Sequence, residues 1–262
     1  MGSSTLSNPA TGLKELFTSP MKADYGIDGP GLVRGYTIAC VVSFALWMIL
    51  IAFEPDADSL VAVARPVLFG IGTWSFVSVA LFVWSSKVGK LRIRDRIISS
   101  IPWRGDEKVL DVGCGRGMML IGAAKHLTTG KAVGVDIWRK VDQAGNSPEA
   151  TMRNAELEGV AGRVEIKNGD ARQLPFADSS FDVILSSLAL HNIPGTDGRR
   201  NAIFEIVRVL RPGGKLVILD IFRTHEYVKS LQEAEMLNVK SSRVGFLFYM
   251  PCHAVAATKP LE

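Results

Sequence analysis

A glycine-rich turn is the first group of residues in this sequence that could do chemistry. It comprises residues 111–117, Asp-Val-Gly-Cys-Gly-Arg-Gly, and lies between a short β-branched run and an apolar helical run. Glycines permit a tight turn, so that backbone N–H groups and the start of the following helix can approach a ligand closely. Such a turn is typical of a cofactor site, although on its own it is a weak signal.

Two further acidic residues occur where neighbouring strands are expected to end. Asp136 lies 21 residues after Gly115, and Asp170 follows the next strand in the sequence Asn-Gly-Asp. Because the carboxyl ends of parallel strands meet at one edge of a sheet, Asp111, Asp136 and Asp170 can line a single crevice. An acid at the position of Asp136 can accept hydrogen bonds from the ribose hydroxyls of an adenosine. The pattern therefore predicts a cofactor that contains adenosine.

The elements that would position these residues alternate between strand and helix. The expected strands are β-branched runs at 108–112, 132–137, 163–167, 181–186 and 216–221, followed by a hairpin of 244–249 and 254–257 with its turn at Pro251 and one antiparallel strand. The expected helices are 118–127, 148–158, 199–210 and 226–236. This alternation predicts an α/β fold with helices on both faces of a mostly parallel sheet.

From about residue 105 to 260, the chain resembles the class I S-adenosylmethionine-dependent methyltransferases. The likeness extends to residues 181–187 (FDVILSS) on the fourth strand and to residues 210–215 (LRPGGK) before the fifth. It implies a Rossmann-like sheet of seven strands whose last strand is antiparallel. It also implies S-adenosyl-L-methionine as the cofactor.

The resemblance assigns roles to the candidate cofactor-binding residues. Asp111, Gly113 and Gly115 would face the methionine portion, and Asp136 would hold the ribose. Ile137 or Trp138 would pack on the adenine, Asp170 with Ala171 would meet its amino group, and Ser186 with Ser187 would lie beneath the sulfonium. The complete set of candidates is Asp111, Gly113, Cys114, Gly115, Gly117, Asp136, Ile137, Trp138, Asp170, Ala171, Ser186 and Ser187.

The main alternative for the crevice is a nicotinamide-dependent dehydrogenase. It would need Gly-x-Gly-x-x-Gly, whereas Gly117 follows Gly115 after only one residue. Nucleic acid is not an expected partner, because the net charge of +4 is slight and the fourth strand lacks the Asn/Asp-Pro-Pro-Tyr/Phe element of amino-methylating enzymes. No metal site is expected either, because the three cysteines are widely scattered.

His191 is the candidate catalytic residue. Methyl transfer from a sulfonium is a direct displacement with an excellent leaving group, so orientation can supply most of the rate. If the acceptor is a hydroxyl or an acidic carbon, His191, just past the fourth strand, is best placed to take its proton. Two roles stay open for it, a general base or a residue that shapes the pocket. Asp220 is a weaker candidate, because a residue at that strand end more often orders the following loop.

The positive mean hydropathy of +0.20 comes mainly from the N-terminal third. Two apolar runs, about 33–53 and 66–84, are long enough to span a bilayer and are separated by the acidic segment 54–59. Five basic residues between positions 87 and 96 follow the second run. Basic flanks stay on the cytosolic side, so we predict an integral membrane hairpin with the N-terminal tail and the catalytic domain in the cytosol. The alternative is a buried helical pair of a soluble fold.

These patterns divide the chain into a tail (1–32), a transmembrane hairpin (33–86), a basic amphipathic linker helix (87–104) and a methyltransferase domain (105–262). Only the loop 138–147 and the linker helix are expected to roof the acceptor site. The sequence therefore predicts a membrane-anchored methyltransferase acting on a hydrophobic or lipid-like small molecule. A methyltransferase of soluble small molecules and a cofactor-binding but non-catalytic membrane assembly factor remain alternatives, and the oligomeric state is not predicted.

Overall fold

One mixed sheet organises the C-terminal two thirds of the chain. The computed structural model describes residues 22–53, 59–139 and 145–262. The strands are β1 (Lys108–Val112), β2 (Lys131–Asp136), β3 (Val164–Asn168), β4 (Phe181–Ser187), β5 (Leu210–Asp220), β6 (Leu237–Leu247) and β7 (Met250–Thr258), in the order β3-β2-β1-β4-β5-β7-β6. The first five are parallel, and β7 is antiparallel to both β5 and β6. The predicted seven-stranded α/β fold is thus confirmed.

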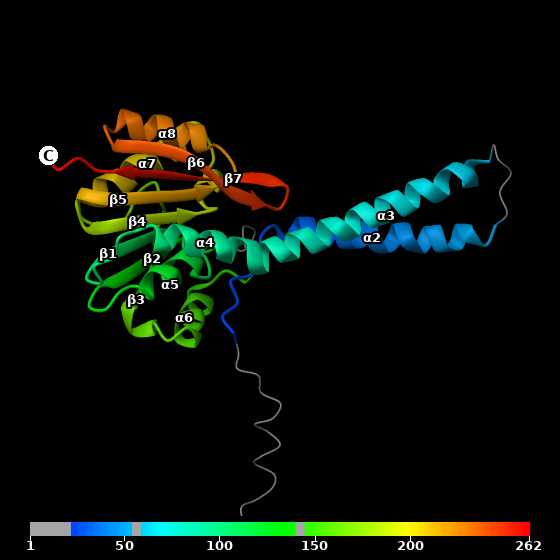
Figure 1. Ribbon diagram of the computed structural model, residues 1–262, viewed down its shortest axis with the longest axis horizontal. Coiled ribbons are helices and arrows are strands. Elements are labelled where there is room, and N and C mark those ends of the chain that lie inside the picture. The colour runs from blue at the N-terminus through cyan, green and yellow to red at the C-terminus, as the bar shows by residue number, and fades with distance from the viewer. Residues whose placement is uncertain (1–21, 54–58, 140–144) are drawn as a thin grey trace, which may run out of the picture.

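Helices cover both faces of this sheet (Figure 1). Successive residues of β1 point to opposite faces, so Val109 packs into one apolar core and Leu110 into the other. The first core is closed by α4 (Lys90–Ser99), α5 (Met118–Ala124) and α6 (Pro148–Leu157), and the second by α7 (Thr196–Val209) and α8 (Thr224–Glu233). Short helical turns lie at η2 (Ala161–Arg163) and η3 (Leu190–Asn192). The carboxyl ends of β1, β2 and β4 remain uncovered by these layers.

The C-terminal hairpin is longer than predicted, and its turn was predicted in the wrong place. β6 begins at Leu237, and Leu247 pairs with Met250, so the turn is formed by residues 248–249. Pro251 lies in β7 itself. Its missing N–H is tolerated there because β7 pairs with β5 only from His253 onward, which leaves one side of Pro251 without a partner strand.

Two long helices precede the sheet and project from it (Figure 1). They are α2 (Pro30–Ile51) and α3 (Leu60–Trp84), and α3 continues through the π-helical turn η1 (Ser85–Gly89) into α4. Pro66 lies inside α3 and does not begin it, because Ser59 caps the helix by accepting a hydrogen bond from the Ala62 N–H. The acidic segment predicted between the helices lies, except for Ser59, outside the described residues.

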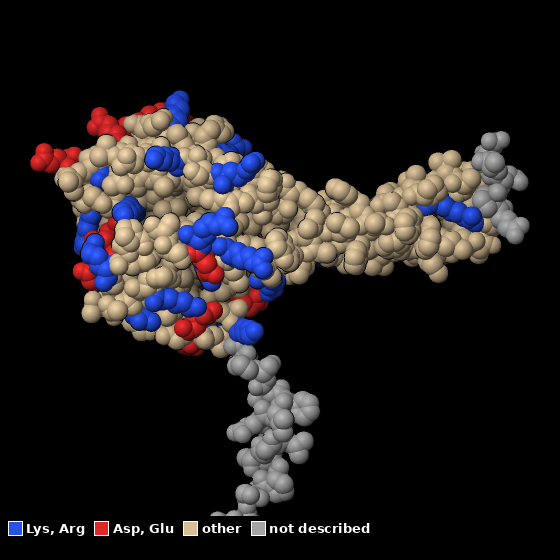
Figure 2. Space-filling model, viewed as in Figure 1, with Lys and Arg blue, Asp and Glu red and all other residues tan. Residues whose placement is uncertain are grey.

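The surface of this helical pair is apolar. Figure 2 shows almost no charge along α2 and α3, whereas charged residues of both signs are spread over the domain that contains the sheet. Both helices are long and apolar enough to cross a membrane, and only 6% and 22% of their most apolar windows are buried. Within the described part of the chain, neither is a buried core helix.

Candidate functional site

A cavity of about 380 Å³ opens at the carboxyl ends of β1, β2 and β4. Its wall includes the glycine-rich turn, the tips of β2 and β4 and the loop after β3. Nine predicted cofactor-binding residues lie in this wall, namely Asp111, Gly113, Cys114, Gly115, Asp136, Ile137, Asp170, Ala171 and Ser187. The topology therefore brings together strand ends that are far apart in the sequence.

The glycine turn is held tightly against the neighbouring strands. The N–H groups of Gly113 and Cys114 both donate to the Val135 carbonyl, at 2.8 and 3.2 Å. Gly113 has a φ of +72°, and a Cβ placed there would lie 2.3 Å from the Cβ of Ala189. Both the backbone conformation and the lack of space require glycine at this position.

We expect Gly113→Ala to destabilise the domain by about 1–3 kcal/mol, because it adds a methyl group to a closed site and strains a positive φ. Gly162→Ala is the matched control, since a Cβ there would meet nothing within 4 Å. Thermal unfolding of the two variants tests this expectation. Equal melting temperatures would show that the turn has room to relax.

Asp136 links the tip of β2 to the glycine turn. One carboxylate oxygen accepts the Gly115 N–H at 2.8 Å, and the other accepts the Trp138 N–H at 2.6 Å. These contacts fix the carboxylate in the wall of the cavity. The Trp138 indole N–H donates to the Asn168 side chain, and Trp138 does not line the cavity. Of the two residues predicted to pack on adenine, only Ile137 lines the cavity.

Three buried polar atoms around the cavity have no hydrogen-bond partner among the described residues. They are Oδ1 of Asp111, Oδ1 of Asn146 and Oγ of Ser187. A buried polar atom without a partner costs free energy, so such atoms indicate groups that a ligand satisfies. Two of the three are acceptors only, which suits a ligand rich in N–H and O–H donors.

Of three further predicted residues, one lines the cavity and two do not. Asp170 lines the cavity but forms a bidentate pair with Arg172, whose guanidinium lowers the pKa of the Asp170 carboxyl. Ser186 does not line the cavity, because its buried hydroxyl donates to the Val112 carbonyl and joins β4 to β1. Gly117 also lies outside the wall, at the start of α5, where its φ of +86° and the nearby Thr151 leave no room for a side chain.

His191 and Asp220 form a hydrogen-bonded pair that was not predicted. Nδ1 of His191 lies 2.6 Å from an oxygen of Asp220, which is fully buried. Because a carboxylate only accepts, this contact places a proton on Nδ1, and the lone pair of the neutral tautomer is then on Nε2. Asp220 also accepts the Ile221 N–H, so it orders the following loop as predicted. The signal for this pair was available, because β4 and β5 are neighbours, Asp220 is the last residue of β5 and His191 follows β4.

The position of His191 leaves both of its predicted roles open. Leu190 and Asn192 on either side line the cavity, but His191 itself does not, and its ring meets Phe222 edge-on at 5.7 Å. The His191 side chain is 18% exposed. A reacting group would have to lie at the edge of the cavity to reach Nε2.

Two residues from the base of the helical pair complete the wall. Asp28 lies two residues before α2, Lys90 begins α4, and both line the cavity. Lys90 is almost fully buried, and its ammonium group donates to the Tyr25 carbonyl and to both oxygens of Asp28. Burial lowers the pKa of Lys90, while the Asp28 carboxylate opposes this change. The linker helix was expected to roof the site, but nothing in the sequence pattern pointed to Asp28.

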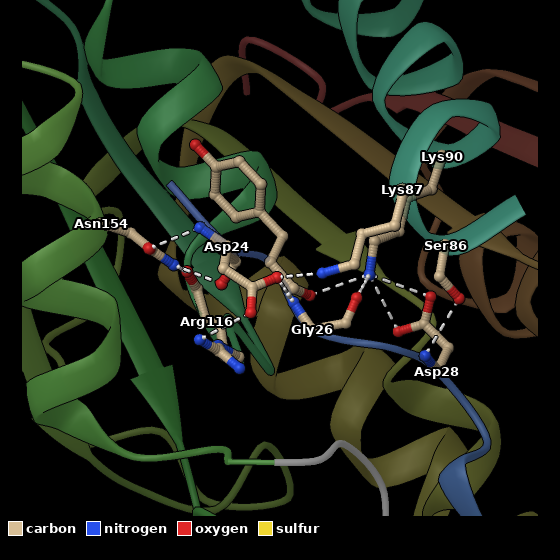
Figure 3. Close-up of polar contacts among 9 residues, drawn as sticks. Asp24, Gly26, Asp28, Ser86, Lys87, Lys90, Arg116 and Asn154 are labelled. Carbon is tan, nitrogen blue, oxygen red and sulfur yellow. Dashed lines mark hydrogen bonds and ion pairs between the residues drawn. The ribbon is translucent and has the colours of Figure 1, made fainter. Parts of the chain in front are cut away.

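Residues 24–28, here called the clamp segment, are tied to the domain on both sides (Figure 3). The backbone of Asp24 exchanges two hydrogen bonds with the Asn154 side chain of α6, at 3.0 and 2.9 Å. The Asp28 N–H donates to Oγ of Ser86 in η1, and Asp24 pairs with Lys87. The clamp segment therefore couples the start of α2 to the wall of the cavity.

Comparison with known proteins identifies the class of this domain. Residues 110–218 match the family described as a methyltransferase domain. A sterol 4-C-methyltransferase of Caenorhabditis elegans is 36% identical over 124 residues, which are 47% of this chain and 34% of that protein. A demethylmenaquinone methyltransferase of Staphylococcus aureus is 34% identical over 128 residues, which are 48% of each chain. The chain contains a class I S-adenosylmethionine-dependent methyltransferase domain.

The solved structures support the fold of this methyltransferase domain. The cyclase SpnF superposes with a TM-score of 0.54 and 20% identity, covering 66% of this chain and 82% of that one. A fold can carry different reactions, so this likeness concerns architecture only. The chain spans about a third of the sterol methyltransferase and about half of the demethylmenaquinone methyltransferase, and the family match at residues 110–218 contains the glycine-rich turn and all of β2, β3 and β4.

The cavity of the methyltransferase domain fits S-adenosylmethionine. The cofactor supplies a cationic sulfonium methyl donor, an amino group and ribose hydroxyls, which are donors or positive charges for the unpartnered Asp111 oxygen and for Asp136. Burial raises the pKa of Asp111 to about 7, although the Leu120 N–H donates to its other oxygen. Asp111 is therefore a group in this wall whose charge responds to pH near neutrality.

The elevated pKa of Asp111 predicts that cofactor affinity depends on pH. A cationic ligand favours the ionised carboxylate, so binding should release a proton and tighten by roughly tenfold from pH 6 to pH 8. The stability of the ligand-free protein has the opposite pH dependence. A raised carboxyl pKa stabilises the fold only at low pH, and this stabilisation is lost as pH rises through about 7. Calorimetry in buffers of different ionisation enthalpy measures both affinity and proton release. Asp111→Asn should bind more weakly and without pH dependence, and an unchanged pH profile in that variant would contradict the assignment.

Proposed function

We propose that this protein is a membrane-anchored methyltransferase that transfers the methyl group of S-adenosylmethionine to a hydrophobic or lipid-like small molecule. The observation that carries the proposal is the shared wall of the cavity. Asp28, which lies two residues before α2, and Lys90, which begins α4 where α3 continues through η1, both line it. The two named relatives, a sterol and a demethylmenaquinone methyltransferase, support a lipid-like acceptor.

The charge distribution supports a cytosolic position for the domain. Residues up to 85 include four basic and six acidic side chains, whereas residues from 86 onward include 26 basic and 20 acidic ones. Basic residues next to a span favour the cytosolic face, where each gains about 1 kcal/mol from anionic headgroups. The proposed division into tail, transmembrane hairpin, linker helix and catalytic domain follows from the same pattern.

The residues of the domain have distinct tasks in this proposal. Asp136 holds the ribose, Ile137 packs on the adenine, and Asp111 faces the positive methionine portion. The bound cofactor supplies the methyl group and its leaving group. His191, oriented by Asp220, accepts the proton of a hydroxyl or acidic-carbon acceptor at the edge of the cavity.

Labelled methyl transfer tests the proposal directly. The purified full-length chain in phospholipid vesicles is incubated with methyl-labelled S-adenosylmethionine and a membrane lipid extract, with Asp111→Asn as the matched variant. We expect label in the organic phase that depends on Asp111. Label only in proteins or only in water-soluble molecules would contradict a lipid-like acceptor. Cofactor binding by calorimetry with no transfer to any extract would favour the non-catalytic assembly factor.

A further inference from the structure

The tip of the β6–β7 hairpin, residues 246–250, lies alongside the second apolar helix. The Tyr249 ring stacks on Trp74 with centroids 5.8 Å apart, and the Phe248 ring stacks on Phe82 at 4.6 Å. Figure 1 shows the hairpin projecting beyond the rest of the sheet toward the base of α3. Trp74 precedes the end of α3 by ten residues, about 15 Å along a helix. The hairpin tip therefore reaches well into the apolar length of α3.

The hairpin tip exposes large apolar side chains. Phe246, Tyr249 and Met250 are 57%, 40% and 37% exposed, and no charged residue occurs from position 244 to 252. The neighbouring face of α3 is equally apolar, since Trp74 is 60% exposed. An edge strand with an exposed apolar end is a hazard for a protein in water unless something covers it. The tip and α3 thus present one continuous apolar surface.

Arginines surround this apolar surface on the side of the domain. The Arg243 guanidinium lies over the Phe246 ring at 5.6 Å, and that of Arg92 lies over Trp84 at 6.0 Å. Arg96 donates to the Val244 carbonyl, at the end of the uncharged stretch. Aromatic rings beside arginines are typical of the boundary between acyl chains and headgroups. The charge at this rim complements lipid phosphates, which favours a bilayer over a second protein surface.

The hairpin tip is fixed to the helix through η1. Oγ of Ser85 accepts the Phe248 N–H at 3.0 Å, and Leu247 is fully buried against Gly89, where an added Cβ would lie 3.8 Å from its side chain. At Gly245 an added Cβ would lie 3.3 Å from Ile93 of α4. These contacts therefore fix the position of the tip along the axis of α3.

We propose that the hairpin tip is a third membrane element, inserted among the lipid acyl chains beside α3 with Arg92 and Arg243 at the headgroups. This inference rests on the proposed membrane anchoring of α2 and α3. η1 also bonds to the clamp segment, because the Asp28 N–H donates to Ser86, and Asp28 lines the cavity. Insertion of the hairpin tip therefore positions the cofactor cavity at the membrane surface. An amphipathic acceptor can then present its reactive group while its apolar part stays in the bilayer.

Depth-dependent quenching of a fluorescent label tests the insertion. The full-length chain with Cys40→Ala is given one accessible cysteine by Met250→Cys or Tyr249→Cys, because Cys114 and Cys252 are buried. Each variant is labelled with an environment-sensitive dye and placed in vesicles of phosphatidylcholine and phosphatidylglycerol. We expect strong quenching by brominated phosphatidylcholine and protection from aqueous iodide at both positions.

Two reference positions separate the possible outcomes. A label at Val67→Cys reports on α3, and one at Lys229→Cys, whose side chain is 79% exposed on α8, reports on the aqueous face. If position 67 is quenched by brominated lipid while position 250 behaves like position 229, the tip does not insert although the anchor does. If position 67 is also quenched by iodide, the membrane anchoring itself is wrong. Protection of position 250 from both quenchers would indicate that the tip is buried against a second copy of the chain, and it would overturn the inference.

Discussion

Replacing His191 by glutamine is expected to slow methyl transfer by a factor on the order of 10²–10⁴ while leaving cofactor affinity unchanged. The expectation follows from the geometry of the His191 and Asp220 pair. Asp220 accepts the Nδ1 proton at 2.6 Å, so the lone pair of Nε2 is available to an acceptor. Glutamine preserves polarity but cannot take a proton. Single-turnover rates with labelled cofactor, together with calorimetric affinity, measure the two quantities separately.

Two further variants distinguish a base from a residue that shapes the pocket. Asp220→Asn should lower the rate as well, because an amide can donate to Nδ1 and shift the ring proton to Nε2. His225→Gln, at an exposed histidine on α8, should leave the rate unchanged. A base also makes the rate rise with pH, and this rise should disappear in His191→Gln. A rate within about twofold of the unsubstituted protein would instead assign His191 to shaping the pocket.

The sheet could be predicted from the sequence because its signals are local. Each parallel strand is a short β-branched run, and each strand end that carries Asp111, Asp136 or Asp170 is followed by a turn or helix signal. The hairpin of β6 and β7 was harder to predict, because Lys240 and Arg243 interrupt the apolar pattern of β6, the exposed edge strand. Its length depends on pairing with β7, which is a tertiary property and not a local one.

The candidate site could be predicted only where one strand end supplies the residue. Nine of the cavity residues follow directly from strand ends. Asp28 and Lys90 reach the cavity because η1 and α4 fold back on the clamp segment, an arrangement that no sequence period encodes. Ser186 failed as a cavity residue for the opposite reason. It alternates with Ser187 along β4, and only Ser187 faces the cavity.

The largest effect on cofactor binding is expected at Asp136. Two hydrogen bonds from ribose hydroxyls to a carboxylate contribute about 1.5–3 kcal/mol each, so Asp136→Ala should weaken S-adenosylmethionine binding by a factor on the order of 10²–10⁴. Asp178→Asn is a control, because that carboxylate is 76% exposed and pairs with Arg208 away from the cavity. Calorimetry with S-adenosylmethionine and with S-adenosylhomocysteine measures both variants. Unchanged affinity in Asp136→Ala would refute the ribose assignment.

A structural explanation for such a loss must be separated from a direct one, because Asp136 also accepts the N–H groups of Gly115 and Trp138. Loosening the glycine turn would weaken every ligand of the cavity by a similar factor. A direct contact predicts a different pattern, in which a cofactor analogue without both ribose hydroxyls binds poorly to the unsubstituted protein and loses little more in Asp136→Ala. If the analogue and the natural cofactor lose affinity equally, Asp136 acts through the turn. If only the natural cofactor does, the carboxylate contacts the ribose.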